Sequence, residues 1–434
     1  MKENLGEIFT ILGAGISGLS AARLLKSLGK RVFLSDSGLP KADIKKEFEC
    51  EFGGHTKRSL DATTIVISPG VPPDIPIVNE AKAKGIKIIS EIELGYRYLK
   101  TKAKTISITG TNGKSTVCSL TAFLLKGQGY KVSLAGNIGN AFSDVVLSKK
   151  RYDFIVLELS SFQLEHLESF CCDIACCLNI TPDHLDRYAD FEAYKKAKLT
   201  IFDHLKEDGV VIENLDNVSF RTPKMLKKVS ISMSKKGDIY LKDKKIVMDG
   251  GIIQHDKTRF LGSFNISNIM FSLAIVQPFI RDFGKLKHDL YNFKPLEHRM
   301  EFVKRVSGVT FVNDSKSTTV HSTTSAVGSF GKKVFLIAGG SSKNEDFLPL
   351  APSVKKWSKG VFLFGQTAPQ IKSTLQKSGV EAKICPDLFL ATKQAFSDAK
   401  EGDIVLLSPA CASFDLYDNY KHRGRSFKQI VKKL

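Results

Sequence analysis

The segment ITGTNGKST, Ile108 to Thr116, joins a predicted strand to a predicted helix. KTISITG, residues 104–110, is apolar enough for a buried strand, and STVCSLTAFLLKGQG, residues 115–129, has the spacing of an amphipathic helix. A glycine-rich turn at this point directs backbone N–H groups and the positive end of a helix dipole at one place, which suits an anion. We therefore predict a phosphate site, although a plain turn with a Ser/Thr cap and a solvated Lys114 remains an alternative.

The spacing of this loop differs from the common phosphate-binding loop. That pattern is G-x-x-x-x-G-K-[ST], whereas here the order is G-x-x-G-K-S-T, with Ile108 where the first glycine belongs. Lys114 is expected to reach the β- and γ-phosphates, and Ser115 or Thr116 to offer a hydroxyl to Mg²⁺. The loop by itself indicates an ATP-using enzyme.

Strands alternate with helical stretches along the whole chain of 434 residues, which predicts an α/β fold with parallel sheets. A length of ~150 residues per domain gives about three domains. We place a Rossmann-like domain at 1–92, a central P-loop-type ATP-binding α/β domain at 93–296, and a Rossmann-like domain at 297–434. The first contains Gly13-x-Gly15-x-x-Gly18, with Asp36 at the end of the next strand. This pattern fits a dinucleotide site, so a nicotinamide- or flavin-dependent oxidoreductase is the competing class.

Composition excludes several other classes. The net charge is +19, but the lysines are scattered, often beside acids, and no aromatic-interleaved basic stripe suggests nucleic acid. No apolar run approaches the ~18 residues of a membrane span, and we see no signal peptide, so we expect a cytoplasmic protein without membrane insertion.

The CC-x-x-x-CC cluster at 171–177 lacks the C-x2-C spacing of zinc ligands, which favours buried free thiols.

Acidic and basic side chains follow the strands after the phosphate loop. Glu158 ends the strand DFIVLE, Asp183, His184 and Asp186 lie on the loop NITPDHLDRY, and FEAYKKAKLTIFDHL predicts a helix that carries Lys198. An acid beside such a loop commonly holds the Mg²⁺ of a nucleotide. Each residue also has a structural alternative: a buried ion pair for Glu158, a helix cap for His184, and a solvated surface for Lys198.

Taken together, the motifs resemble those of the Mur ligase family. The resemblance is collinear over nearly the whole chain and rests on these segments: GTNGKST, ELSSFQLE, N-x-T-x-D-H-x-D-R-Y at 179–188, Tyr194-x-x-x-Lys198, Leu296-x-His298-Arg299-x-Glu301, Asn313-Asp314-Ser315-Lys316 and SPACASFD at 408–415. The shortened loop is the form that this ATP-dependent family uses.

The resemblance implies an ATP-dependent amide ligase of peptidoglycan precursor synthesis that works through an acyl phosphate. The last two motifs and the Rossmann-like start point to the member that adds D-glutamate to UDP-N-acetylmuramoyl-L-alanine. Members that add L-alanine, a diamino acid or a dipeptide, and folylpolyglutamate synthetase, remain alternatives. The first domain then holds the uridine diphosphate of the substrate instead of a dinucleotide, and the enzyme is expected to be a monomer.

The family pattern also implies site residues. ATP would be bound by Gly110, Thr111, Asn112, Gly113, Lys114, Ser115, Thr116, Asn265, Asn268, Arg299 and Asp314. The UDP-substrate would be bound by Gly15, Ile16, Ser17, Asp36, Ser37, Gly70 and Asn137. D-glutamate would be bound by Lys316, Thr318, Lys343, Ser413 and Tyr420.

Catalysis would depend on Lys114, Glu158, His184 and Lys198. Two Mg²⁺ ions are implied, one on Ser115 and Glu158 and one on His184 and Lys198, the lysine only if it is carbamylated. Two positions and one segment depart from the pattern: Phe264 replaces a usual histidine, Thr319 stands where asparagine often ends the motif, and GGSSKNEDF replaces GG-x-D-K-G-x-D-F. These departures bear on adenine and D-glutamate binding more than on the phosphate chemistry.

Overall fold

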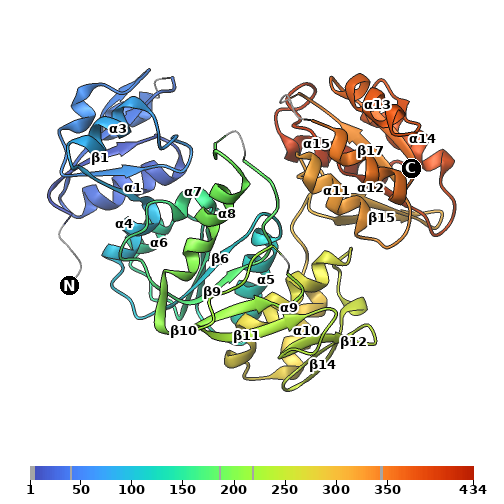
Figure 1. The fold of residues 1–434 in the computed structure, drawn as a ribbon, viewed down its shortest axis with the longest axis horizontal. Helices are drawn as coiled ribbons and strands as arrows, with labels where there is room; N and C mark the ends of the chain where they lie inside the picture. The colour runs from blue at the N-terminus through green and yellow to red at the C-terminus, as the bar shows by residue number, and fades with distance from the viewer. Residues whose placement is uncertain (1–4, 40–41, 185–186, 218, 343–345) are drawn as a thin grey trace. The chain divides into compact units, whose positions relative to one another are not determined.

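The computed structural model describes residues 5–39, 42–184, 187–217, 219–342 and 346–434. Its contacts divide the chain into two compact units. Residues 1–241, 247–251 and 270–289 form the first unit, and residues 242–246, 252–269 and 290–434 form the second. Figure 1 shows α/β architecture throughout, with helices packed on the sheets. Each unit is described by itself.

The N-terminal part of the first unit is a five-stranded sheet in the order β3-β2-β1-β4-β5, and its strands pair in parallel. Its elements are β1 (Ile8–Leu12), α1 (Ile16–Ser27), β2 (Arg31–Asp36), α2 (Ala42–Glu47), β3 (Glu49–Phe52), η1 (Lys57–Leu60), β4 (Thr64–Ile67), α3 (Pro76–Ala83), β5 (Lys87–Ser90) and α4 (Glu91–Tyr98). Gly18 lets α1 pack closely, because a Cβ there would lie 1.8 Å from the Gly13 carbonyl oxygen. The predicted strand–turn–helix fingerprint is confirmed.

The central sheet contains the phosphate loop. Within the first unit its strands run in the order β12-β11-β10-β9-β6-β8-β7. The elements are β6 (Lys104–Thr109), α5 (Lys114–Gly127), β7 (Val132–Gly136), α6 (Phe142–Leu147), β8 (Phe154–Glu158), α7 (Ser161–Leu164), β9 (Cys172–Cys177), α8 (Phe191–Leu199), η2 (Thr200–Phe202), β10 (Leu205–Asn214), β11 (Lys227–Ser232) and β12 (Ile239–Lys242). The following elements are β13 (Lys245–Met248), β14 (Gly251–Gln254), η3 (His255–Lys257), α9 (Phe264–Val276), η4 (Gln277–Phe279) and α10 (Phe283–Asn292).

Most of the second unit is a six-stranded sheet in the order β15-β16-β20-β17-β18-β19. Only the edge pair β15–β16 is antiparallel among the strand pairs of this sheet in the described ranges. The elements are β15 (Glu301–Val306), β16 (Val309–Asn313), α11 (Val320–Gly328), β17 (Val334–Gly339), η5 (Leu348–Leu350), α12 (Ala351–Trp357), β18 (Ser358–Phe364), α13 (Ala368–Lys377), β19 (Lys383–Ile384), α14 (Leu388–Asp398), β20 (Ile404–Leu407) and α15 (Tyr420–Lys432). The apolar runs KKVFLIAGG, KGVFLFGQ and DIVLLSPA form β17, β18 and β20, in line with the predicted alternation of strands and helices.

The predicted helix FEAYKKAKLTIFDHL is too long. Regular α-helix ends at Leu199, and a 3₁₀ turn continues to Phe202. The carbonyl of His204 already accepts from the Cys172 N–H of β9 at 2.8 Å. Because the chain joins the sheet at His204, the residues after Phe202 do not continue the helix that their apolar pattern predicts.

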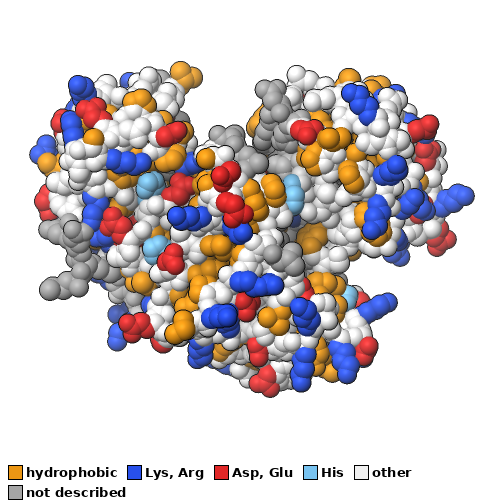
Figure 2. Space-filling view, viewed as in Figure 1, with side chains coloured by type: hydrophobic (Ala, Val, Ile, Leu, Met, Phe, Trp, Pro, Cys, Tyr) orange, Lys and Arg blue, Asp and Glu red, His pale blue; other side chains and the backbone are white. Residues whose placement is uncertain are grey.

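The charged side chains and the cysteines can be compared with what the composition predicted. On the face that Figure 2 shows, lysine and arginine side chains are interspersed with acidic ones. The eight cysteines, all within the described ranges, are free thiols. Cys172, Cys176 and Cys177 are buried as expected, but Cys171 is only partly buried. No helix in the described ranges has both the length and the apolar character that crossing a bilayer requires.

A buried carboxyl group begins α4. Glu91 is 2% exposed, and one of its oxygens accepts from the backbone N–H of Ser143. Oε2 has no hydrogen-bond partner among the described residues. Burial raises the pKa of Glu91 to about 7.

We expect Glu91→Gln to change the pH dependence of stability. The folded-state pKa lies above the ordinary value of 4.5, so folding binds a proton in this window and the stabilisation is lost as pH rises through about 7. From pH 5 to pH 8 the wild type should lose about 2 to 3 kcal/mol of unfolding free energy relative to Glu91→Gln. Denaturant melts at several pH values measure this, with the exposed Glu192→Gln as control. Parallel pH profiles for wild type and Glu91→Gln would contradict it.

Candidate active site

The phosphate loop connects β6 to α5. Gly113 caps the helix with a φ of 89°, a left-handed conformation that favours glycine. No acidic residue lies in the first turn of α5, so its positive end faces no carboxylate of its own helix. The Lys114 Nζ donates to the carbonyls of Gly110 at 2.7 Å and Thr111 at 2.9 Å. Ser115 and Thr116 are buried in the first turn.

A second lysine reaches the same loop from α8. Lys198 is 2% exposed, and its Nζ donates to the Gly110 carbonyl at 3.0 Å. The ammonium lies 4.8 Å from the centre of the Tyr194 ring, one turn earlier on the helix. Burial, followed by repulsion from Lys114, lowers the pKa of Lys198 to about 7. The alternative of a solvated surface lysine is therefore wrong.

Glu158 lies at the same edge of the sheet. It ends β8, opposite Ile108 of the parallel neighbour β6. Its Oε1 accepts from the Asn137 Nδ2 at 2.9 Å, while its buried Oε2 has no hydrogen-bond partner among the described residues. No ion pair of Glu158 occurs within the described ranges, which argues against the ion-pair alternative.

These oxygens fit a hard cation. A buried carboxylate oxygen without a donor is costly unless something positive meets it, and Ser115 supplies a hydroxyl on the adjoining helix. The described residues contain no group of three or more His, Cys, Asp or Glu side chains arranged for a metal. An ion here would therefore take its remaining ligands from nucleotide phosphates and water, as Mg²⁺ commonly does.

One pocket of about 290 Å³ collects most of the predicted catalytic side chains. Five of its lining residues were predicted from sequence: Gly70, Lys114, Asn137, His184 and Lys198. The other six had no assigned role: Pro69, Ser160, Ser161, Phe162, Asp183 and Tyr194, of which Asp183 was noted as an acid on the loop and Tyr194 as part of a family motif. His184 has a φ of 54°. Asp190 caps α8 instead of His184, so the helix-cap alternative for His184 is wrong.

Part of the predicted UDP region lies at the start of α1, whereas Asn137 lines the pocket with Lys114. Gly15 is the N-cap of this helix, and the Ile16 side chain is 79% exposed. The Asp36 carboxylate accepts from the N–H groups of Ala14 and Gly38, so this acid also organises the loops around it. A hollow of about 320 Å³ nearby is lined by Ser37, His55, Gly70, Val71, Pro72, Ile75, Pro76 and Ile77.

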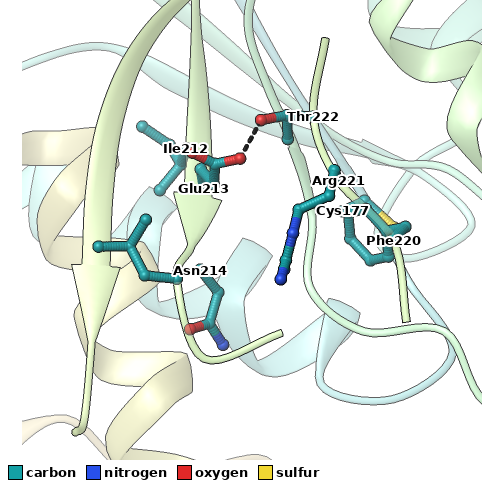
Figure 3. Close-up of a pocket in the computed structure, with 8 residues that line it drawn as sticks. Cys177, Ile212, Glu213, Asn214, Phe220, Arg221 and Thr222 are labelled. Atoms are coloured by element: carbon teal, nitrogen blue, oxygen red, sulfur yellow. Dashed lines mark hydrogen bonds between the residues drawn. The ribbon is translucent and has the colours of Figure 1, made fainter. Parts of the chain in front are cut away.

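A separate hollow lies at the end of β10. Figure 3 shows Glu213 and Thr222 pointing toward each other, joined by a hydrogen bond. Asn214 and Arg221 also line this hollow, as does Cys177. None of the residues predicted for substrate, nucleotide or metal lines it.

In the second unit, the residues predicted for adenine and ribose form two local networks. The Asn268 Nδ2 donates to the Asn265 Oδ1 at 2.9 Å. The buried Asp314 carboxylate accepts from the Met300 N–H at 3.2 Å and from the Ser408 hydroxyl at 2.9 Å. Burial raises the pKa of Asp314 to about 6, with the Arg299 charge acting in the opposite direction.

Sequence reasoning missed a buried cation, Arg423, which contacts chain neighbours of Lys316 and Ser413, two of the residues predicted for D-glutamate. The Lys316 Nζ lies 5.4 Å from the centre of the Tyr420 ring, and Ser413 is buried. Arg423 is fully buried and donates to the carbonyls of Ser315, Cys411 and Ala412, and to the hydroxyl of Ser315. The signal for it was an arginine on the apolar face of a helix, in line with Phe427 and Val431. Lys343 lies outside the described residues.

Three family profiles match consecutive parts of the chain. They are a Mur ligase MurD-like N-terminal domain at 7–90, a Mur ligase middle domain at 108–276, and a Mur ligase glutamate ligase domain at 298–411. Two curated relatives are each called UDP-N-acetylmuramoylalanine–D-glutamate ligase. The one from Caldicellulosiruptor saccharolyticus is 37% identical and covers 99% of both chains. The one from Fusobacterium nucleatum subsp. nucleatum is 38% identical and covers 98% of both.

The chain belongs to the Mur ligase family. Solved Mur ligases share the fold. UDP-N-acetylmuramate-alanine ligase MurC from Thermotoga maritima matches with a TM-score of 0.60 at 17% identity, over 98% of this chain and 99% of that one. MurF ligase from the same organism, solved with ADP, matches with a TM-score of 0.60 at 17% identity, over 93% and 95%. The predicted fold class and family resemblance are confirmed.

Proposed function

We propose that this Mur ligase joins the L-alanyl carboxylate of UDP-N-acetylmuramoyl-L-alanine to the amine of D-glutamate and converts ATP to ADP and phosphate. The observation that carries the proposal is the convergence of the Lys114 and Lys198 amines on the Gly110 carbonyl, at the sheet edge that holds Glu158. The names of the full-length relatives support this choice of substrates. The same product would serve peptidoglycan precursor synthesis in the cytoplasm.

The first step brings two anions together. The substrate carboxylate attacks the γ-phosphorus of ATP, the bond to the bridging oxygen breaks, and ADP leaves with the electron pair. Lys114 lowers the repulsion, because its ammonium lies at the helix start where phosphate oxygens accumulate charge. Burial of the site strengthens that attraction relative to water.

The second step forms the amide. The neutral amine of D-glutamate attacks the acyl phosphate, the tetrahedral intermediate expels inorganic phosphate, and the amine proton is lost. Lys316, Thr318, Ser413 and Tyr420 of the second unit, together with Lys343, would hold the two carboxylates of D-glutamate. Cationic and hydroxyl donors suit carboxylates.

The metal proposal involves four residues. Ser115 and Glu158 would hold a nucleotide-bound Mg²⁺, and a second ion would lie on His184 and a carbamylated Lys198. Such ions neutralise phosphate charge when bound. The lowered pKa of Lys198 supports carbamylation, because only a neutral amine reacts with CO₂.

The remaining binding assignments follow the same proposal. The phosphate loop, from Gly110 to Thr116, would hold the phosphates of ATP, and Asn265, Asn268, Arg299 and Asp314 would hold its adenosine. Gly15, Ile16, Ser17, Asp36, Ser37, Gly70 and Asn137 would bind the UDP-substrate. We also propose that the enzyme is a monomer with domains at 1–92, 93–296 and 297–434.

Phosphate release measured with ATP, UDP-N-acetylmuramoyl-L-alanine and a panel of amino acids tests the function. D-glutamate should be used, and L-glutamate should give at least about a hundredfold lower kcat/KM, because a polar site that holds an amine and two carboxylates fixes handedness. Preference for L-alanine, a diamino acid or a dipeptide would reassign the enzyme within the family. Saturable binding of NADH with nicotinamide fluorescence, and no ligation, would support the oxidoreductase alternative.

A further inference from the structure

The loop that follows β9 clamps the phosphate loop. The carbonyl of Asn179 accepts from the Thr111 N–H at 2.8 Å. The side chain of Asn179 then makes two hydrogen bonds to one residue: its Oδ1 accepts from the Asn112 N–H at 2.8 Å, and its Nδ2 donates to the Asn112 carbonyl at 3.0 Å. A carboxamide is the side chain that offers both an acceptor and a donor in one plane.

A second residue of the same loop completes the clamp. The Thr181 N–H donates to the Thr111 hydroxyl at 3.1 Å, and that hydroxyl lies 3.2 Å from the Thr181 carbonyl and 3.0 Å from the Tyr194 hydroxyl. Thr111 is therefore bonded through its N–H and its hydroxyl, and Asn112 through its N–H and its carbonyl. The loop after β9 supports the phosphate loop at two consecutive residues.

This clamp sets the direction of a peptide. A loop that binds an anion must turn its carbonyl oxygens away and its N–H groups toward the ligand. The Asn112 carbonyl is held by the Asn179 Nδ2, and the peptide that joins Asn112 to Gly113 is trans. Since C=O and N–H of a trans peptide point in opposite directions, the Gly113 N–H is turned away from Asn179.

We propose that Asn179 is a positioning residue for ATP, which orients the Asn112–Gly113 peptide so that the loop presents N–H groups to the phosphates. The inference rests on the proposed use of ATP. It assigns to Asn179 no contact with the nucleotide. Its effect should therefore fall on ATP and leave the UDP-substrate unaffected.

Asn179→Ala tests this through binding and kinetics. The Kd of a fluorescent ATP analogue carrying an N-methylanthraniloyl group should rise about tenfold to a hundredfold, from the loss of two hydrogen bonds. The KM for ATP should rise similarly, and the KM for UDP-N-acetylmuramoyl-L-alanine should stay within about twofold. Binding of the analogue is measured without the other two substrates. It therefore tests the role of Asn179 even if the enzyme does not use UDP-N-acetylmuramoyl-L-alanine or D-glutamate, and the two failures can be told apart.

Asn214→Ala is the matched control. Asn214 ends the neighbouring strand β10, and its Oδ1 accepts from the Asp216 N–H at 3.0 Å. It should bind the analogue as the wild type does.

If Asn179→Ala does not fold, Asn179→Asp is the second variant. It keeps the size and the acceptor but loses the donor and adds negative charge, so it should weaken binding of the ATP analogue at least as much. Wild-type affinity in either folded variant, or equal weakening of both substrates, would overturn the proposal.

Discussion

Lys114→Ala is expected to lower ligation about a thousandfold while the fold survives. The Lys114 ammonium donates to two carbonyls of its own loop, at 2.7 and 2.9 Å. Its removal should cost the protein little stability, because it also relieves repulsion of the buried Lys198. The main loss should be in catalytic rate, because Lys114 would neutralise the negative charge that develops on the phosphate oxygens in the transition state. Phosphate release and thermal melting measure the two effects.

Lys126→Ala is the control for this variant. Lys126 lies in the last turn of the same helix and is exposed. It should keep wild-type activity and stability. Near-normal turnover in a folded Lys114→Ala protein would contradict the assignment of the loop to ATP.

Lys198→Ala should lower activity about a hundredfold or more, and added acetate should restore part of it. A plain ammonium would repel Mg²⁺, whereas a carbamate supplies oxygen ligands that a hard cation prefers. Acetate can enter the space that the shortened side chain leaves and supply a carboxylate there. Activity is measured as phosphate release with increasing acetate, and Lys195→Ala, on the same helix and paired with Glu192, is the control.

The pH and CO₂ dependence of the wild type separates this explanation from a purely structural role. With a pKa of about 7, the amine is mostly neutral at pH 8 and mostly protonated at pH 6. Bicarbonate should therefore stimulate decarbonated enzyme more strongly above pH 7 than below it. Three additional atoms beyond the Lys198 Nζ should be visible in an electron-density map. A fully active Lys198→Ala protein would remove the residue from the mechanism.

Much of the architecture was predictable because its causes are local. Apolar periods and glycine turns identify β6 and α5, and they place Glu158 at a strand end. Parallel pairing of β6 with β8 and β9 then requires their carboxyl ends to share one edge. The predicted end of α8 was wrong because its cause is not local. The His204 carbonyl pairs with the Cys172 N–H of β9, a contact that the helical pattern of the sequence does not contain.

The sequence by itself determined the fold class, the family and the residue types available for chemistry, because these follow from short-range patterns and collinear motifs. Only the tertiary structure decided which of them are buried and paired. Lys198 is inaccessible despite its lysine neighbours, and it meets Gly110 across 88 positions of the chain. Asn179 clamps Asn112 across 67 positions, and Arg423 ties Ser315 across 108. Burial and hydrogen bonding over such separations depend on how sheets bring distant loops together, and no local pattern encodes that proximity.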